Sequence, residues 1–146
     1  GFTLIELLVV VAIIGILAAV GVVAYSGYTA GAKKSAVKSN QAAVVKYVAA
    51  ELKKCEIGET SVMGTNLTCS QRKSSGKVKD ATSSALGTEF KNPYATSSTA
   101  IVKTTLSACN ATTEGQTSVS DDGTTVTIKS CTANGETLLS NTVTIE

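Results

Sequence analysis

The sequence contains no histidine and no tryptophan, and it has only one proline and one methionine. Histidine is the commonest general base and the commonest metal ligand, so its absence argues against an enzyme or a metal protein. The net charge is only +2 and Arg72 is the single arginine, so a strongly basic nucleic-acid surface is not indicated. We expect a protein that is not an enzyme, needs no cofactor or metal, and makes at most weak contact with DNA or a surface.

The four cysteines all lie in the polar part of the chain, at Cys55, Cys69, Cys109 and Cys131. None belongs to a CxxC pair and no histidine can complete a zinc site, so disulfides formed in an oxidising compartment are expected. Four cysteines allow three pairings. We favour Cys55 with Cys69 and Cys109 with Cys131, because each bridge closes a compact loop between neighbouring segments, and the crossed pairings stay open.

The first 25 residues form an apolar stretch that holds one carboxylate, Glu6. From Leu7 to Tyr25 there is no charge, which is about the length that crosses the hydrocarbon core of a bilayer at roughly 1.5 Å per helical residue. An unpaired carboxylate within a membrane costs several kcal/mol and marks a functional site. A single chain offers Glu6 no evident partner in the bilayer, so the residues alone leave the identity of that partner open.

The apolar pattern continues into an amphipathic helix that we expect to reach about residue 54. Apolar residues recur at spacings of three, four and seven, while lysines take the other faces. Together the two stretches predict one helix of about 50 residues, roughly 75 to 80 Å long. The stripe that we expect to be buried consists of Val37, Val44, Val48, Leu52 and Cys55.

The remaining chain predicts a small head. Residues 55–98 are expected to be a polar loop region with one short helix near Lys79–Leu86, and residues 99–146 an antiparallel sheet with a C-terminal disulfide loop. Turns are expected at Asp121–Gly123 and at Ala133–Glu136. The predicted strands are Thr99–Leu106, Thr117–Ser120, Thr124–Ser130 and Thr137–Ile145.

The alternation of apolar residues in the last strands requires a cover for one face of the sheet, and the helix stripe is the nearest one. The fold class is therefore α+β, a long N-terminal helix spine packed against a C-terminal antiparallel β-meander. Its parts are expected to be a transmembrane or filament-core helix (1–25), the amphipathic half of the same helix (26–54), the cysteine-bearing loops (55–98) and the sheet (99–146).

Several weaker signals have simpler explanations. Aromatic residues make up only 4% of the chain, too few for an electron-conducting array, so we expect the helix tyrosines to pack. Asp121-Asp122-Gly123 could suggest a metal loop, but a hairpin turn explains it better. Two acceptor patterns for glycosylation and one basic patch are also present. The residues behind these signals are Tyr25, Tyr28 and Tyr47 in the helix, Asn66 and Asn110 in the acceptor patterns, and Lys73, Lys77 and Lys79 in the basic patch.

The opening residues Gly1-Phe2-Thr3-Leu4-Ile5-Glu6 and the apolar helix that follows resemble the type IV pilins, with a major-pilin N-terminus of the type IVa kind. The motif is specific over roughly the first 30 residues, and the rest of the chain is similar to the family only in layout. The resemblance implies a cut between Gly1 and Phe2, N-methylation of Phe2, and a role for Glu6 in assembly beside the N-terminal ammonium of the adjacent subunit. Val23 stands where members of the family commonly carry proline.

The resemblance implies a structural subunit of a pilus filament, or fimbrium. The chain is expected to lie in the inner membrane, and then in a homopolymer on the cell surface, after the action of a prepilin peptidase and assembly machinery. Such fibres serve twitching motility, adhesion or DNA uptake. Similar pilins unwind between Gly15 and Val23 in the filament, which the low helix propensity of Gly15 and Gly21 would ease. The alternative is a pseudopilin of a type II secretion system.

Overall fold

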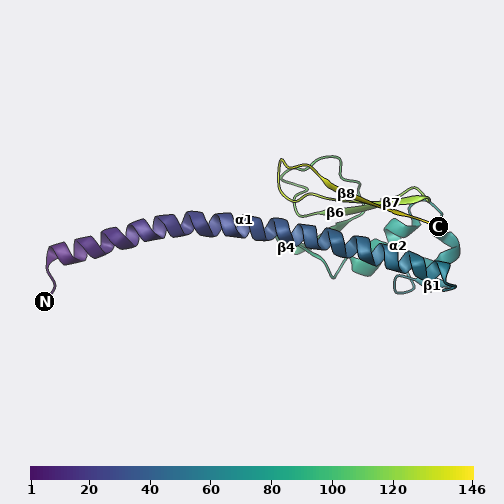
Figure 1. The fold of residues 1–146 in the computed structure, drawn as a ribbon, viewed down its shortest axis with the longest axis horizontal. Coiled ribbons are helices and arrows are strands. Elements are labelled where there is room, and N and C mark those ends of the chain that lie inside the picture. Colours follow the sequence, from purple (N-terminus) through teal and green to yellow (C-terminus); the bar gives the residue numbers. More distant parts are fainter. The chain divides into compact units, whose positions relative to one another are not determined.

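The computed structural model describes residues 1–146, which divide into two compact units, Gly1–Ala32 and Lys33–Glu146. We call the first the N-terminal unit and the second the head (Figure 1). Helix α1 contributes to both. The elements in chain order are α1 (Leu4–Glu56), β1 (Ser61–Val62), β2 (Leu67–Thr68), the 3-10 turn η1 (Cys69–Gln71), α2 (Lys77–Leu86), β3 (Lys91–Asn92), β4 (Ala95–Thr99), β5 (Ile101–Val102), β6 (Thr117–Asp121), β7 (Thr125–Ser130) and β8 (Leu139–Thr144).

The N-terminal unit is the helical stretch up to Ala32, and none of its residues is buried. Helix α1 is long and apolar enough to cross a membrane, and its most apolar window of 18 residues has a mean hydropathy of 3.1. The predicted long helix is thus present, from Leu4 to Glu56.

In the head, α1 buries the stripe that the sequence predicts. Val37, Val44 and Val48 are fully buried, and Leu52 and Cys55 are nearly so. Two polar residues of the helix, Gln41 and Glu51, are also buried. The predicted stripe of apolar residues does not include them. The expected burial of one helix face is confirmed, and the polar groups on it need partners inside the head.

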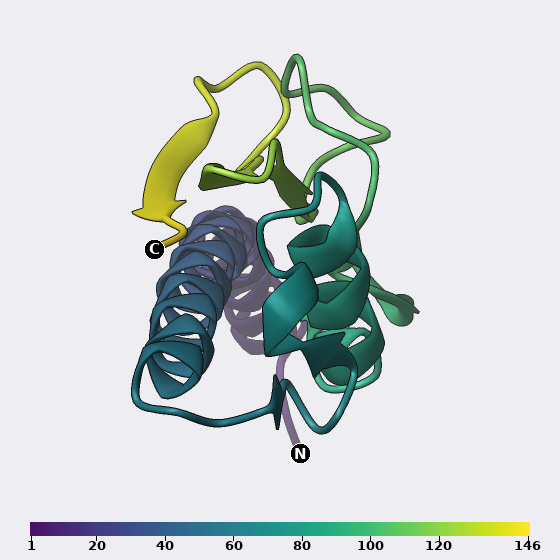
Figure 2. The same cartoon turned by 90° about the vertical axis from the view of Figure 1, so that its right-hand side faces the viewer.

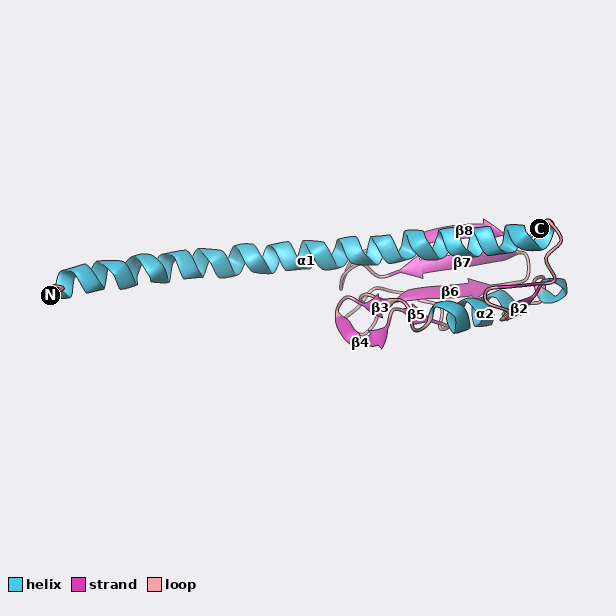
Figure 3. Ribbon diagram, turned by 90° about the horizontal axis from the view of Figure 1, so that it is seen from below, coloured by secondary structure: helices cyan, strands magenta, loops and turns pink.

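The main sheet has the strand order β5-β6-β7-β8 (Figure 3). Strands β6, β7 and β8 form an antiparallel meander, with Val119 opposite Ile128 and Val126 opposite Val143. Alternate residues of β7 are buried, as its period-two pattern predicts. With the long helix, this sheet confirms the α+β class.

The first predicted strand of the sheet is wrong in extent and direction. The prediction ran from Thr99 to Leu106, whereas β5 covers only Ile101–Val102 and pairs parallel to β6. A parallel neighbour requires the chain to return to the starting edge of the sheet, and residues 103–116 make that return. Thr99 instead ends β4, which pairs with β3 in a separate ladder.

Residues 55–98 hold more regular structure than the predicted loops and single helix. They contain the β1–β2 hairpin, η1, α2 and most of the β3–β4 pair. Strands of two residues are too short to show a periodic pattern, so no sequence signal predicts them. In the β1–β2 turn, Met63 and Thr65 adopt positive φ angles of 56° and 73°, a conformation that is uncommon outside glycine.

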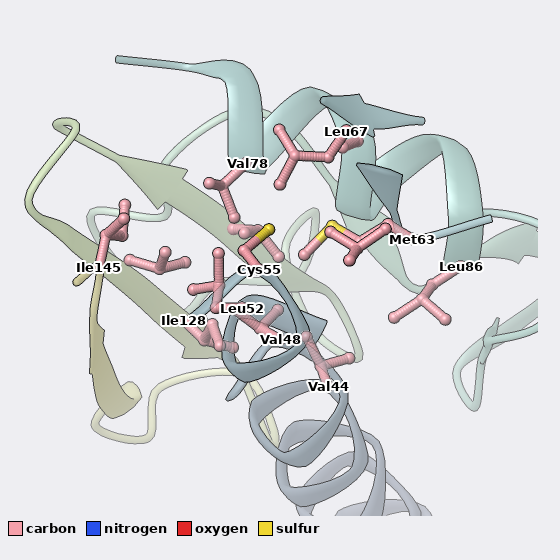
Figure 4. Close-up of a cluster of buried hydrophobic side chains, with 14 of the residues drawn as sticks. Val44, Val48, Leu52, Cys55, Met63, Leu67, Val78, Leu86, Ile128 and Ile145 are labelled. Carbon is pink, nitrogen blue, oxygen red and sulfur yellow. The ribbon is translucent and has the colours of Figure 1, made fainter. Parts of the chain in front are cut away.

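The hydrophobic core lies between α1, α2, the β1–β2 hairpin and the main sheet (Figure 2). Side chains from all four parts converge on one centre (Figure 4). The labelled members are Val44, Val48, Leu52 and Cys55 of α1, Met63 and Leu67 of the hairpin region, Val78 and Leu86 of α2, and Ile128 and Ile145 at the sheet. Because this core is small, each of these four parts needs the other three to bury its apolar side chains.

Two disulfides close the head. Cys55, near the end of α1, is joined to Cys69 at the start of η1, with 5.4 Å between the Cα atoms. Cys109, in the return segment, is joined to Cys131 just after β7, with 5.2 Å between the Cα atoms. These are the pairs that we favoured from the sequence. Each bridge restricts the unfolded chain and supports a core that is otherwise thin.

Gln41 connects α1 to the main sheet through a buried polar network. Its Nε2 donates to the carbonyl of Ile128 at 2.8 Å and to Oδ1 of Asn141 at 3.1 Å. Its Oε1 accepts a hydrogen bond from the hydroxyl of Ser130, which is also bonded to the hydroxyl of Thr117 at 2.8 Å. The side-chain amide thus joins β7 and β8 to the helix and sets which residue of α1 faces which strand.

Asp121 and Asp122 have separate structural tasks at the end of β6. The carboxylate of Asp121 accepts the backbone N–H of Gly76 and, at 2.6 Å, that of Lys79, which holds the first turn of α2. This capping explains why α2 begins at Lys77 rather than at the predicted Lys79. Oδ1 of Asp122 accepts the backbone N–H groups of Thr125 at 2.7 Å and Thr124 at 2.8 Å, forming the β6–β7 turn.

We predict that Gln41→Leu destabilises the full chain in detergent by about 2–4 kcal/mol, because the hydroxyl of Ser130 and the carbonyl of Ile128 lose buried hydrogen bonds. Denaturant unfolding followed by circular dichroism measures the change. Ser39→Ala, at an exposed position on the same helix, should stay within about 0.5 kcal/mol of the unmodified chain. A Gln41→Leu variant as stable as this control would contradict the role of the network.

The turn at Asp122 predicts a loss of stability in acid. The hydrogen bonds from Thr125 and Thr124 lower the pKa of this carboxyl from 3.8 to about 2. A carboxyl with a lowered pKa contributes stability above its unfolded pKa and loses it as the pH falls toward the folded value. We expect unfolding between pH 4 and pH 2 to show this loss, and Asp122→Asn, which keeps an acceptor oxygen, to show less of it. Equal acid sensitivity in both proteins would rule the assignment out.

Candidate assembly site

The N-terminal unit exposes a continuous apolar surface. Seventeen large apolar or aromatic side chains between Phe2 and Tyr28 are each more than half exposed. In the rest of the chain, only Ile57 is a large apolar side chain with comparable exposure. Exposed apolar patches beyond a few hundred Å² mark sites of contact with a membrane or another protein. We therefore treat this surface, residues 2–28, as the candidate assembly site.

Glu6 has a partner within its own chain, contrary to the expectation that a monomer offers none. Its Oε2 accepts the backbone N–H of Thr3 at 2.8 Å, and the hydroxyl of Thr3 accepts the backbone N–H of Glu6 at 3.2 Å. This reciprocal pair is a capping box, which satisfies two N–H groups at the start of α1. The signal was in the sequence as the pattern Thr3-x-x-Glu6 and was overlooked.

The capping box satisfies hydrogen bonds but leaves the charge of Glu6 without an opposite charge. Glu6 takes part in no salt bridge, and the ion pairs of the chain all lie in the head. The next cationic side chain in the sequence is Lys33. A carboxylate in an apolar environment still gains from a cation supplied by another molecule.

Gly15 and Gly21 lie in unbroken helix in the single chain, as does Val23. A Cβ atom added at either glycine would meet no atom within 4 Å. The fold of the single chain therefore does not require glycine at these two positions.

The three helix tyrosines lie in different surroundings. Tyr47 is half-buried and packs against the core of the head. Tyr25 and Tyr28 are 71% and 77% exposed, so the expectation that all three pack is wrong for these two in the single chain. Their exposure places them on the candidate assembly site.

The head contains no comparable candidate for a functional site. A groove of about 500 Å³ is lined by residues that include Tyr47, Ser84 and Glu89, and no hydrogen bond joins the hydroxyl of Ser84 to the carboxylate of Glu89. No group of three His, Cys, Asp or Glu side chains could hold a metal ion. Lys73 and Lys77 are exposed, but the neighbouring Asp80 pairs with Lys103 at 3.2 Å.

The Asn66 and Asn110 acceptor sites are both exposed and their side chains take part in local turns. The amide of Asn66 donates to the carbonyl of Met63 at 2.7 Å. Oδ1 of Asn110 accepts the backbone N–H of Thr112 at 2.9 Å. Nothing in this geometry points to a modification.

Residues 1–22 match the family model of the prokaryotic N-terminal methylation motif. No curated protein and no solved structure matches the chain. The matched motif contains Phe2, Thr3 and Glu6 and most of the exposed apolar surface. It implies processing by a prepilin peptidase and assembly into a multimer, and it belongs to structural subunits rather than to an enzyme family. The chain therefore carries the N-terminal signature of the type IV pilins and pseudopilins.

Proposed function

We propose that this chain is the structural subunit of a type IV pilus. Before assembly, residues 2–25 hold it in the inner membrane, and afterwards the same residues bundle with those of other copies in the core of an extracellular filament. The observation that carries the proposal is the exposed apolar surface of residues 2–28, which ends in a motif with a single uncompensated carboxylate.

The apolar surface supports both the membrane stage and the filament stage, because in each its side chains must be shielded from water. Fully burying a Leu, Ile or Val side chain gains about 1.5–3 kcal/mol relative to water, so a segment with this many exposed apolar side chains is not stable in water alone. Lipid covers it without selecting a partner. Other copies of the segment cover it equally well, and small residues such as Gly15, Ala19 and Gly21 let helices approach closely.

Glu6 is proposed to set the register between subunits. After cleavage between Gly1 and Phe2 and methylation of Phe2, the N-terminal ammonium of one subunit would pair with the carboxylate of Glu6 in its neighbour. A charge pair in a dry core is costly to break, because the remaining charge is left buried and unpaired. Thr3 would keep its hydroxyl bond to the backbone of Glu6 in both states.

We predict that Glu6→Gln abolishes fibres while the protein still accumulates in the membrane. Glutamine retains the capping box but lacks the charge, so the ammonium of the neighbour stays unpaired at a cost of about 3–5 kcal/mol per subunit. Electron microscopy of sheared fibres and immunoblots of membrane fractions provide the two readouts.

Thr3→Ala is the matched control, because it removes the hydroxyl of the capping box and keeps the charge. We expect it to weaken the start of α1 by about 1 kcal/mol and to leave fibres in place. If Glu6→Gln assembles normally while Thr3→Ala does not, the essential function of Glu6 is capping and the pairing between subunits is wrong.

Gly15 and Gly21 are proposed to ease a local loss of helix between Gly15 and Val23 in the filament. Gly15→Ala and Gly21→Ala should each favour helix by about 1 kcal/mol and so reduce fibre yield. Gly27→Ala and Gly31→Ala, which also add a Cβ atom in open space, should leave the yield unchanged. A filament map with unbroken α-helical hydrogen bonds from Gly15 to Val23 would refute the proposal.

The second candidate is a pseudopilin of a type II secretion system, which shares the N-terminal motif. Two disulfides and a Ser/Thr-rich head with the exposed strand β4 support the pilus, because a long fibre meets the external medium. Long extracellular fibres made of this chain would decide for the pilus. Motility, adhesion and DNA uptake are the proposed uses of such a fibre, and the exposed Lys73 and Lys77 would support weak contact with DNA.

A further inference from the structure

Tyr25 and Tyr28 are the first two aromatic side chains after an aliphatic run. From Leu7 to Ala24 every residue is Leu, Ile, Val, Ala or Gly. The run corresponds to about 27 Å of helix, close to the hydrocarbon thickness of about 30 Å. Glu6 therefore marks one end of this run and the two tyrosines mark the other.

The two phenol rings lie on one side of the helix, because residues three apart are neighbours on a helical surface. They are 71% and 77% exposed, and neither hydroxyl is hydrogen-bonded within the chain. The hydroxyl of Thr29 differs, since it donates to the backbone carbonyl of Ser26 at 3.0 Å. An aromatic ring with a free hydroxyl suits the membrane–water interface, where the ring meets acyl chains and the hydroxyl meets water and headgroups.

We propose that Tyr25 and Tyr28 form an interfacial anchor that contacts the phospholipid headgroup region and fixes how deeply the span sits before assembly. The proposal rests on the membrane stage of the proposed function and adds a lipid partner to these two residues. It also explains why they are exposed in the single chain while Tyr47 packs in the head.

The absence of native tryptophan allows a direct test of depth. Full-length chains with Tyr25→Trp or Tyr28→Trp each carry a single tryptophan and are reconstituted in vesicles of phosphatidylethanolamine and phosphatidylglycerol. Lipids brominated at graded depths along the acyl chain then quench the fluorescence. Ile16→Trp, near the middle of the aliphatic run, is the deep reference, and Ile57→Trp, exposed on the head, is the aqueous one.

We expect the shallowest brominated lipid to quench tryptophan at positions 25 and 28 most strongly, because these rings should lie about 15 Å from the midplane. Ile16→Trp should be quenched best by the deepest lipid, and Ile57→Trp hardly at all. If positions 25 and 28 match the deep or the aqueous reference, the anchor is wrong and the membrane span stands. If Ile16→Trp escapes quenching by every lipid, both the span and the anchor are wrong.

A second measurement tests whether the tyrosines fix the depth rather than only occupy it. The Ile16→Trp reporter is combined with Tyr25→Leu and Tyr28→Leu, which extend the apolar run and remove both hydroxyls. We expect the quenching profile of the reporter to shift away from the deepest lipid. Val22→Leu with Val23→Leu is the matched control and should leave the profile unchanged. An identical profile in the two backgrounds would overturn the anchoring function.

Discussion

The organisation of this protein depends on one continuous helix. The apolar side chains of its two halves are shielded from water in different ways. In the head, the stripe from Val37 to Cys55 is buried by the protein itself. In the N-terminal unit the apolar side chains are exposed, and the chain supplies nothing to cover them. Since exposed apolar surface on this scale is unstable in water, the N-terminal unit is complete only in contact with lipid or with other copies.

The start of α1 shows how a short motif can serve two purposes. Thr3 and Glu6 satisfy each other's backbone N–H groups, which stabilises the first turn wherever the helix lies. The carboxylate that makes this cap is also the one charged side chain between Gly1 and Ala32. In a medium of low dielectric constant its charge is far more costly than its hydrogen bonds are favourable, so the cap leaves the charge of Glu6 uncompensated.

The head is small and relies on specific connections as well as on burial. The Gln41 network fixes α1 against β7 and β8, the carboxylate of Asp121 holds the first turn of α2, and two disulfides close the loops. Near the C-terminal end of α1, Glu51 accepts the backbone N–H of Met63 at 2.6 Å. This bond stabilises the β1–β2 turn, where Met63 has a positive φ angle. Burial raises the pKa of Glu51, but bonds from Lys54 and Met63 outweigh it and lower the pKa overall.

The sequence by itself determined the long helix, its apolar N-terminal half, the buried stripe and the last three strands, because period and composition are local properties of the chain. It also contained the capping pattern of Thr3 and Glu6, which is a local signal because its two residues lie within one helical turn. Only the tertiary structure decided the parallel pairing of β5, the burial of Gln41 and the capping of α2 by Asp121. Each of these joins residues far apart in sequence, and such contacts depend on how the packed elements meet rather than on any local pattern.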